Sequence, residues 1–131
     1  MSALELAEKQ QTIIDYGKTH LGARYRYGGE DPKKGFDCSG FTKYVYENSL
    51  GVELPRSARQ MSEIGTEVAP AALHPGDLIL FDLEGSLDHV GIYMGEGQFF
   101  HASRQKRKII VGDLHNEYFS TRFNTARRVL Q

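Results

Sequence analysis

The chain has 131 residues, of which 40% are hydrophobic and 25% are charged, and its formal net charge is −1. This length and composition suit one globular domain over residues 1–131 and leave no room for two ordinary domains. The near-balanced charge argues against binding to nucleic acid, which requires a basic face. No stretch approaches the ~20 apolar residues of a membrane span, and no export signal is visible at the N-terminus.

Helical signals dominate the first half of the chain. Apolar residues of the first segment recur at helical spacing, and Ser57 and Gln60 have the spacing of a capping box. The predicted elements are a helix over 3–21, a turn-rich stretch over 22–35, a second helix over 39–48, and a short helix that follows Pro55 and ends at Gly65.

Strand signals dominate the second half. Short apolar runs replace the helical spacing after Gly76, and Gly95-Glu96-Gly97 between two such runs predicts a β-hairpin. The predicted elements are strands over 78–81, 89–94, 98–103, 108–111 and 127–130, with a short helix or turn over 118–124. Helices followed by strands predict an α+β domain with a largely antiparallel sheet.

Cys38 is the sole cysteine, so the chain has no internal disulfide. A lone cysteine is commonly a small buried hydrophobic residue. Its place at the predicted start of the second helix indicates a different role, because the partial positive charge of a helix N-terminus favours the thiolate. The backbone N–H groups there could also hold the oxyanion of a tetrahedral intermediate. Cys38 is therefore a candidate nucleophile.

A thiol nucleophile needs a base, and the chain has five histidines. Three of them, His20, His74 and His115, are predicted to lie at a helix end or in loops, where no rigid element positions the ring. His89 and His101 differ because each lies on one arm of the predicted hairpin.

The loop length of the hairpin decides whether His89 and His101 meet. A three-residue loop makes them diagonal neighbours on one face of the sheet, roughly 7–8 Å apart between Cα atoms, with Gly91 opposite His101. A two-residue loop would put them on opposite faces. In the first case, His89 is the base for Cys38 and His101 orients the His89 ring. The alternative for His101 is a histidine packed at the sheet edge.

Cys38, His89 and His101 also have the composition of a zinc site. The sequence offers no clear fourth ligand and no close CxxC or HxxxH spacing, so the zinc interpretation is weak. We expect no metal and no organic cofactor.

Blocks of sequence along most of the chain resemble the NlpC family of bacterial cell-wall cysteine peptidases, a papain-like group. The blocks occur in the same order as in the family, which makes the set far more specific than the DCSG tetrapeptide alone. They are GARYRYGG at 22–29, FDCSGF at 36–41, LPRS at 54–57 with Gln60, PGDL at 75–78, DHVGIYMG at 88–95 and QFFHA at 98–102.

The resemblance implies a papain-like α+β fold and hydrolysis of the peptide stems of peptidoglycan. The bond cleaved in this family typically joins D-glutamate to a diamino acid such as meso-diaminopimelate. The implied catalytic set is Cys38, His89 and His101. Tyr25 corresponds to a family tyrosine that lies beside the cysteine and could help to bind the oxyanion or the substrate. The alternative for Tyr25 is an aromatic residue packed on the first helix.

Asp37, Ser39 and Arg56 resemble the polar groups on the substrate side of the family's site. Asp37 could hold the free amine of the stem's L-alanine, and Arg56 could pair with a substrate carboxylate. Their alternatives are a helix N-cap for Asp37 and a solvated cation for Arg56. The basic run 104–108 is usually a solvated loop, with attraction to an anionic wall polymer as the alternative.

The expected partner is a peptidoglycan stem peptide, and the expected location of the chain, as a monomer, is the bacterial cell envelope, periplasmic or secreted. Two rival functions stay open. One is an amidase or acyltransferase that uses the same residues on a non-wall substrate, and the other is a catalytically silent wall-binding domain. The intact set of Cys38, His89 and His101 argues against the second.

Overall fold

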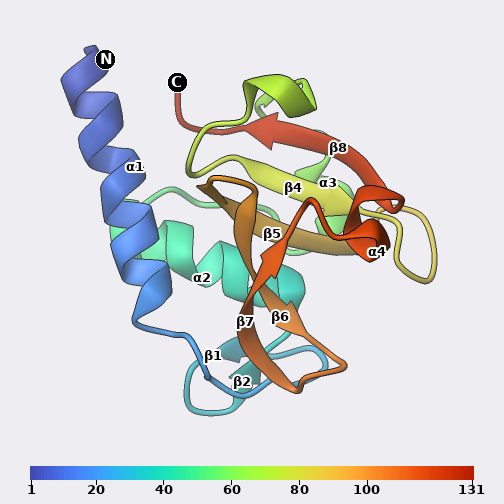
Figure 1. The fold of residues 1–131 in the computed structure, drawn as a ribbon. Coiled ribbons are helices and arrows are strands. Elements are labelled where there is room, and N and C mark those ends of the chain that lie inside the picture. Colours follow the sequence, from blue (N-terminus) through green and yellow to red (C-terminus); the bar gives the residue numbers. More distant parts are fainter.

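The computed structural model describes residues 1–131, and its first helix, α1, covers Ala3–Lys18 (Figure 1). Ser2 and Glu5 form a capping box at its start. The prediction extended this helix to residue 21. It ends earlier because the N–H groups of His20 and Leu21 bond to carbonyls three residues back, at 3.0 and 3.2 Å, which tightens the last turn.

Helix α2 covers Cys38–Leu50, so Cys38 is its first residue. Asp37 caps it, because its carboxylate accepts the Gly40 N–H at 2.6 Å. A methyl group on Gly40 would collide with the carbonyl oxygen of Gly29, so the glycine lets the helix start approach this loop. Gly51, with φ of 68°, ends the helix in the left-handed conformation. The helix is longer than the predicted 39–48 by one residue at its start and two at its end.

The strands form a six-stranded antiparallel sheet, which confirms the predicted α+β class. Its spatial order is β3-β8-β4-β5-β6-β7. Helices α1 and α2 contact each other, and α2 contacts β5 and β6 (Figure 1). The strands are β3 (Thr66–Glu67), β4 (Leu78–Phe81), β5 (His89–Gly95), β6 (Gln98–Ser103), β7 (Lys108–Asp113) and β8 (Phe123–Arg128). The smaller elements are the hairpin β1 (Glu30–Asp31) with β2 (Gly35–Phe36), the helices α3 (Ala58–Met61) and α4 (Glu117–Ser120), and the 3₁₀ turn η1 (Pro70–Ala72).

The last strand was predicted over 127–130, where two apolar residues follow two arginines; the strand exists, but these bounds are wrong. Strand β8 instead covers Phe123–Arg128 and pairs with β4 and β3. Its arginines face structural partners: Arg127 donates to the carbonyls of Ile64 and Gly65, and Arg128 pairs with Asp77. The bounds of this strand therefore depend on bonds to residues far away in the sequence, and local hydrophobicity does not indicate them.

The turn of the β5–β6 hairpin differs from the predicted three-residue loop. The turn itself contains two residues, Glu96 and Gly97, both with positive φ, as in the turns that fit a two-residue hairpin. A register shift between Tyr93 and Gly95 adds the residue that the shorter turn lacks. Beyond it, Ile92 pairs with Phe100 and Tyr93 with Phe99, which is the predicted register.

Two apolar clusters lie on the two sides of the sheet. The larger has 17 buried residues and joins α1 and α2 to strands through side chains such as Ile13, Phe41 and Ile92. The smaller consists of Ile79, Phe81 and Phe99, against which Phe119 packs. No helix of the structure is both long and apolar enough to cross a bilayer.

Asp77 ties the start of β4 to the end of the chain. Its buried carboxylate accepts two hydrogen bonds from Arg128, at 2.9 and 2.8 Å, and one from the backbone N–H of His74 at 2.7 Å. Beside it, the buried hydroxyl of Tyr46 on α2 donates to the carbonyl of Gly76. The PGD turn is therefore a structural joint between sheet and helix.

We predict that Asp77→Ala lowers the free energy of unfolding by about 3 kcal/mol, because it leaves the half-buried Arg128 guanidinium without its counter-charge. Urea denaturation measures this loss. Glu53→Ala removes an exposed carboxylate that has no hydrogen-bond or ion-pair partner and should change the unfolding free energy by less than ~0.5 kcal/mol. Equal effects of the two substitutions would contradict the assigned role.

Candidate active site

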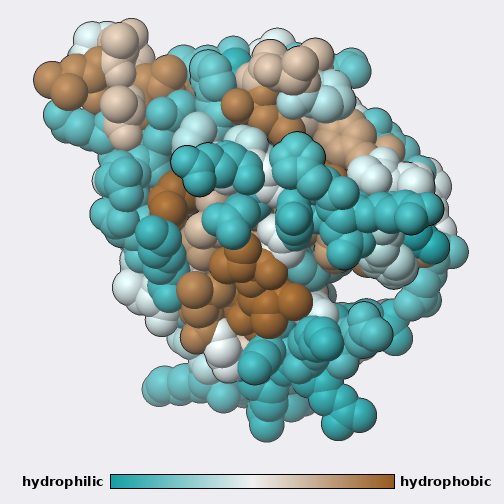
Figure 2. Space-filling view, viewed as in Figure 1, coloured by the Kyte–Doolittle hydropathy of each residue, from teal (hydrophilic) through white to brown (hydrophobic).

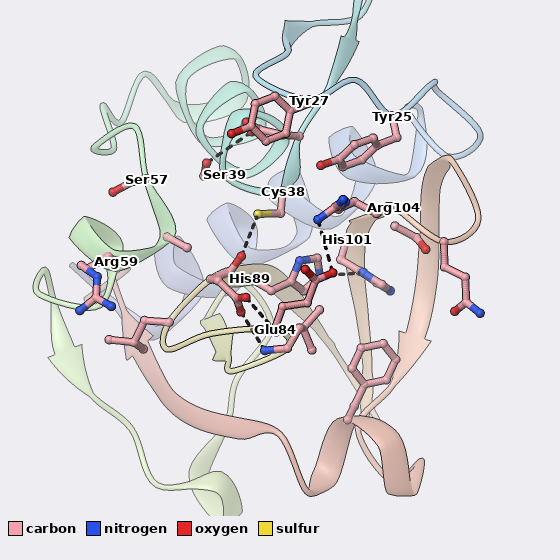
Figure 3. Close-up of a pocket in the computed structure, with 18 of the residues that line it drawn as sticks. Tyr25, Tyr27, Cys38, Ser39, Ser57, Arg59, Glu84, His89, His101 and Arg104 are labelled. Carbon is pink, nitrogen blue, oxygen red and sulfur yellow. Dashed lines mark hydrogen bonds and ion pairs between the residues drawn. The ribbon is translucent and has the colours of Figure 1, made fainter.

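A groove of about 530 Å³ lies between the start of α2, the loop before β5 and the turn after β6. Cys38, His89 and His101 all line it (Figure 3). The other lining residues are Tyr25, Tyr27, Asp37, Ser39, Ser57, Ala58, Arg59, Leu83, Glu84, Ser86, Leu87, Asp88, Ser103, Arg104, Gln105, Tyr118 and Phe119. The groove therefore joins residues from both halves of the chain around a single thiol.

Cys38 lies against the first residues of β5. Its sulfur is 3.9 Å from the carbonyl oxygen of Asp88, the residue before His89. Burial raises the pKa of the Cys38 thiol to about 11, although backbone N–H groups, including that of Ser39, lower it in part. The expected preference for the thiolate at this helix start is thus wrong for the resting site. Desolvation outweighs the helix N-terminus, and the thiol is neutral at pH 7.

His89 and His101 meet on the sheet, as the register predicts. Nε2 of His89 is 2.9 Å from Nδ1 of His101, with the two rings nearly perpendicular. Both residues are buried, at 7% and 3% exposure. Burial lowers the pKa of His89 to about 4, with the nearby Asp88 opposing, and lowers that of His101 to about 3. Both imidazoles are therefore neutral at pH 7, and Nδ1 of His89 is the ring nitrogen left free for a proton.

Asp88 organises the loop in front of His89, and the sequence reasoning did not single it out. Its carboxylate accepts the N–H groups of Leu83, Glu84 and Gly85 at 2.7, 2.9 and 2.7 Å. Burial would raise the pKa of this carboxyl, but these N–H donors lower it below its usual value. The signal available in the sequence for Asp88 was its place directly before the candidate base, His89. Asp88 fixes the loop that forms one wall of the groove.

The far nitrogen of His101 has no partner. Its Nε2 is buried without a hydrogen bond and lies near Gly112 of β7. The His101 ring packs edge-to-face against Phe119, with 5.3 Å between the two ring centroids. A methyl group on Gly112 would lie 3.0 Å from this nitrogen and 2.6 Å from Phe99. Glycine at position 112 thus leaves the space that the His101 ring occupies.

Tyr25 lines the same groove as Cys38, and Figure 3 shows its hydroxyl directed towards the groove. Burial, followed by the proximity of Cys38, raises the pKa of the Tyr25 hydroxyl, which is neutral at pH 7. A neutral phenol donates a hydrogen bond, so Tyr25 is placed to meet a polar atom of a bound substrate.

Asp37 and Arg56 form one ion-paired unit with Ser39. Arg56 donates to both carboxylate oxygens of Asp37, at 3.1 and 2.9 Å, and to the Ser39 hydroxyl at 2.8 Å. It also pairs with Glu30 at 3.2 Å. Asp37 is at the same time the N-cap of α2. Asp37 and Ser39 line the groove, whereas Arg56 supports them from behind and is not a freely solvated cation.

The other histidines lie outside this groove. His20 packs its ring against Tyr16 and Tyr44, and the ring of His115 covers Gly97 at the hairpin turn. No group of three or more His, Cys, Asp or Glu side chains has an arrangement that could hold a metal ion.

Comparison with known proteins decides the family. The NlpC/P60 family model matches residues 22–128. The chain belongs to the NlpC/P60 family. A crystal structure of an NlpC/P60 family protein from Bacillus cereus ATCC 10987 superposes with a TM-score of 0.86 at 34% identity, covering 93% of this chain and 40% of that one. The α+β fold described above is thus the papain-like fold of the family.

The curated relatives of the chain include two named hydrolases. The chain is 43% identical over 118 residues to the murein DD-endopeptidase MepS/murein LD-carboxypeptidase of Escherichia coli (strain K12), covering 90% of this chain and 62% of the relative. It is 36% identical over 128 residues to the gamma-DL-glutamyl hydrolase of Bacillus subtilis (strain 168), covering 96% of this chain and 31% of the relative. The chain therefore spans less than two thirds of the length of either.

We predict slow alkylation of Cys38 by iodoacetamide at pH 7. Burial raises the thiol pKa to about 11, so the reactive thiolate fraction rises only as the pH approaches that value. The labelling rate, followed by mass spectrometry from pH 5 to pH 10, should increase throughout. The same protein unfolded in urea is the control and should titrate near 8.5. A rate plateau below pH 7 would contradict a neutral thiol.

We predict that both active-site imidazoles carry their proton on Nε2. If His89 keeps Nδ1 free for a proton, its Nε2–H must donate to Nδ1 of His101, which leaves the His101 proton on the partnerless Nε2. Nitrogen-15 NMR of the histidine rings at pH 7 distinguishes the tautomers, with His101→Gln used for assignment. A His101 proton found on Nδ1 would show that His89 is not poised as a base.

Proposed function

We propose that this chain hydrolyses an amide bond in the peptide stems of peptidoglycan, using Cys38 as the nucleophile. The observation that carries the proposal is the groove in which the sulfur at the start of α2 meets the hydrogen-bonded pair of His89 and His101. Its support is the names of the relatives, which are murein and glutamyl hydrolases. Residues 1–131 form a single catalytic domain, which acts as a monomer in the bacterial cell envelope.

The chemistry starts from neutral groups. As the Cys38 sulfur attacks the substrate carbonyl, its proton passes to Nδ1 of His89, and the His101 ring stabilises the resulting imidazolium through the bond to Nε2. The backbone N–H groups at the start of α2 hold the oxyanion, with the Tyr25 hydroxyl as a further donor. The imidazolium then protonates the leaving amine. Water, deprotonated by His89, cleaves the thioester to release the acid, and the His89 imidazolium returns the proton to the departing Cys38 sulfur.

Transfer of the proton during attack suits a buried site. A thiol with a pKa near 11 and an imidazole with a pKa near 4 do not exchange a proton at rest. The incoming carbonyl provides the negative oxygen that balances the imidazolium, so the charges appear together in the transition state. Preorganised N–H donors contribute most to the rate in such a low-dielectric site.

The bond we assign joins D-glutamate to a diamino acid such as meso-diaminopimelate. Asp37 lies within the groove next to Cys38 and serves as the partner of the free amine of the stem peptide. The Ser39 hydroxyl and the Arg56 guanidinium both donate to the Asp37 carboxylate and hold it in place. When the amine of the stem is anchored at Asp37, the bond that reaches the sulfur lies a fixed number of atoms from that amine. This fixed spacing selects the glutamyl bond over bonds further along the stem.

We expect the protein to release the diamino acid from L-alanyl-γ-D-glutamyl-meso-diaminopimelate, as detected by mass spectrometry. Cys38→Ser and His89→Ala should each lower kcat/KM by at least ~10³-fold, because each removes a reacting group. His101→Gln keeps a polar partner for His89 and should lower it by only about 10²-fold. Lys9→Gln, at an exposed position on α1 outside the groove, is the control and should stay within a few-fold of the wild type.

The products separate the rival functions. Cleavage of muropeptide cross-links with an intact glutamyl bond would replace the assigned bond. Cys38-dependent turnover of other amides with no muropeptide cleavage would favour the amidase or acyltransferase. Wall binding without any turnover would overturn the proposal and leave a silent binding domain.

A further inference from the structure

A second hollow adjoins the groove and is lined by Tyr25 and four arginines. The arginines are Arg24, Arg26, Arg104 and Arg107. They come from two segments that are about 80 positions apart in the sequence. Backbone hydrogen bonds hold these segments side by side: the Tyr25 N–H donates to the carbonyl of Arg107 at 3.0 Å, and the Ile109 N–H to that of Ala23 at 2.9 Å. The cluster is thus built by the fold and is not only a basic run.

The positive charge of this hollow is balanced only at its edge, where Arg104 pairs with Glu84. All four arginines are exposed, and no acidic residue lines the hollow. Lys106 lies in the same turn, and Lys108 is the first residue of β7. The whole chain has a net charge of −1, so the cations are concentrated here and do not reflect an overall excess. Figure 2 shows hydrophilic side chains at this lower end of the molecule, where the β6–β7 turn lies. Guanidinium groups around a concave surface create a potential that attracts anions.

The hollow and the catalytic groove are continuous. Tyr25 and Arg104 line both of them. Figure 3 shows Ser57 and Arg59 on one side of Cys38, and Tyr25 and Arg104 on the other. Asp37 is bonded to Arg56, the neighbour of Ser57 in the chain. A peptide whose amine lies at Asp37 and which continues along the groove past Cys38 would therefore reach the arginines with the part that follows the scissile bond. This part is the leaving group.

Arg104 is held at the groove by a weak ion pair. Its guanidinium lies 3.4 Å from the carboxylate of Glu84 on the opposite loop, and both side chains are at least 66% exposed. An exposed pair of this length contributes little to stability. A substrate carboxylate can take the place of Glu84, so Glu84 marks where an acidic group fits.

We propose that the arginine hollow is a binding site for the carboxylates of the substrate's leaving residue. The inference rests on the proposed function, which supplies a diamino acid with free carboxylates after the scissile bond. Arginine binds a carboxylate through two parallel N–H donors, which gives orientation as well as attraction. The hollow would thus select stems whose diamino acid carries free carboxylates over stems in which these are amidated.

Two measurements test this site. Binding of L-alanyl-γ-D-glutamyl-meso-diaminopimelate and of the same peptide with the diamino acid carboxylates amidated is measured by calorimetry on the Cys38→Ser protein. Hydrolysis of both peptides is measured on the active protein. We expect the free acid to bind about tenfold more tightly than the amidated peptide. The double variant Arg104→Gln/Arg107→Gln should remove this preference, because it raises Kd and KM for the free acid alone and leaves kcat within about twofold.

The controls keep the result specific to the hollow. Lys9→Gln/Lys18→Gln removes two exposed charges from α1 and should leave the preference intact. Glu84→Gln should lower the KM for the free acid, because Arg104 then has no competing carboxylate.

The outcomes distinguish the two proposals. Hydrolysis of both peptides with no preference, unchanged in the double arginine variant, would overturn the hollow as a carboxylate site and leave the hydrolase intact. Selective binding without hydrolysis would support the hollow and refute the hydrolase. If the double variant loses affinity for polyphosphate but not for the peptide, the hollow serves a phosphate polymer and the inference is wrong.

Discussion

The register of β5 against β6 is the constraint on which the site depends. Side chains alternate across a sheet, so a slip by one residue would send His89 and His101 to opposite faces. The bulge between Tyr93 and Gly95 compensates for the two-residue turn and keeps both rings on one face. Glycines at 91 and 112 leave room for Phe99, which packs against His101, since a methyl group at either position would crowd the Phe99 ring. Backbone pairing therefore fixes the distance between the two imidazoles before any side chain adjusts.

Burial determines the electrostatics of the same site. The smaller apolar cluster packs against the histidines through Phe81 and Phe99, and it excludes water from both rings. Neutral forms of the thiol and imidazoles are favoured, although the thiol lies at a helix start. The carboxylates nearest the site are engaged elsewhere, Asp37 with Arg56 and Asp88 with backbone N–H groups. The charges around the reacting groups are thus fixed in place, while the reacting groups themselves are uncharged.

Much of this arrangement could be predicted because it depends on local signals. Apolar periodicity and the capping box of Ser57 and Gln60 placed the helices, and strand alternation placed the hairpin to within a residue. Chemical identity singled out Cys38, His89 and His101. The hairpin register was predicted correctly in spite of a wrong turn, because the bulge restored the count of residues.

Other features depend on contacts that a single sequence does not display. Strand β8 is positioned by bonds from Arg127 to carbonyls more than 60 positions away. The raised pKa of Cys38 comes from burial beneath residues of both halves of the chain, whereas the helix N-terminus is visible in the sequence. The arginine hollow forms because residues 24–26 lie beside the β6–β7 turn, and the sequence of neither segment indicates that the two are neighbours.

The double use of Asp37 has a consequence for how such a domain can diversify. The residue that caps the helix of the nucleophile also lines the groove beside Cys38, where we propose that it binds the substrate amine, so its replacement would weaken the helix start and the proposed recognition together. The side chains of the β6–β7 turn have no such structural role, because its cationic residues are exposed and support no part of the core. New substrate preferences are therefore most accessible through this turn, where sequence can vary at little cost to the scaffold.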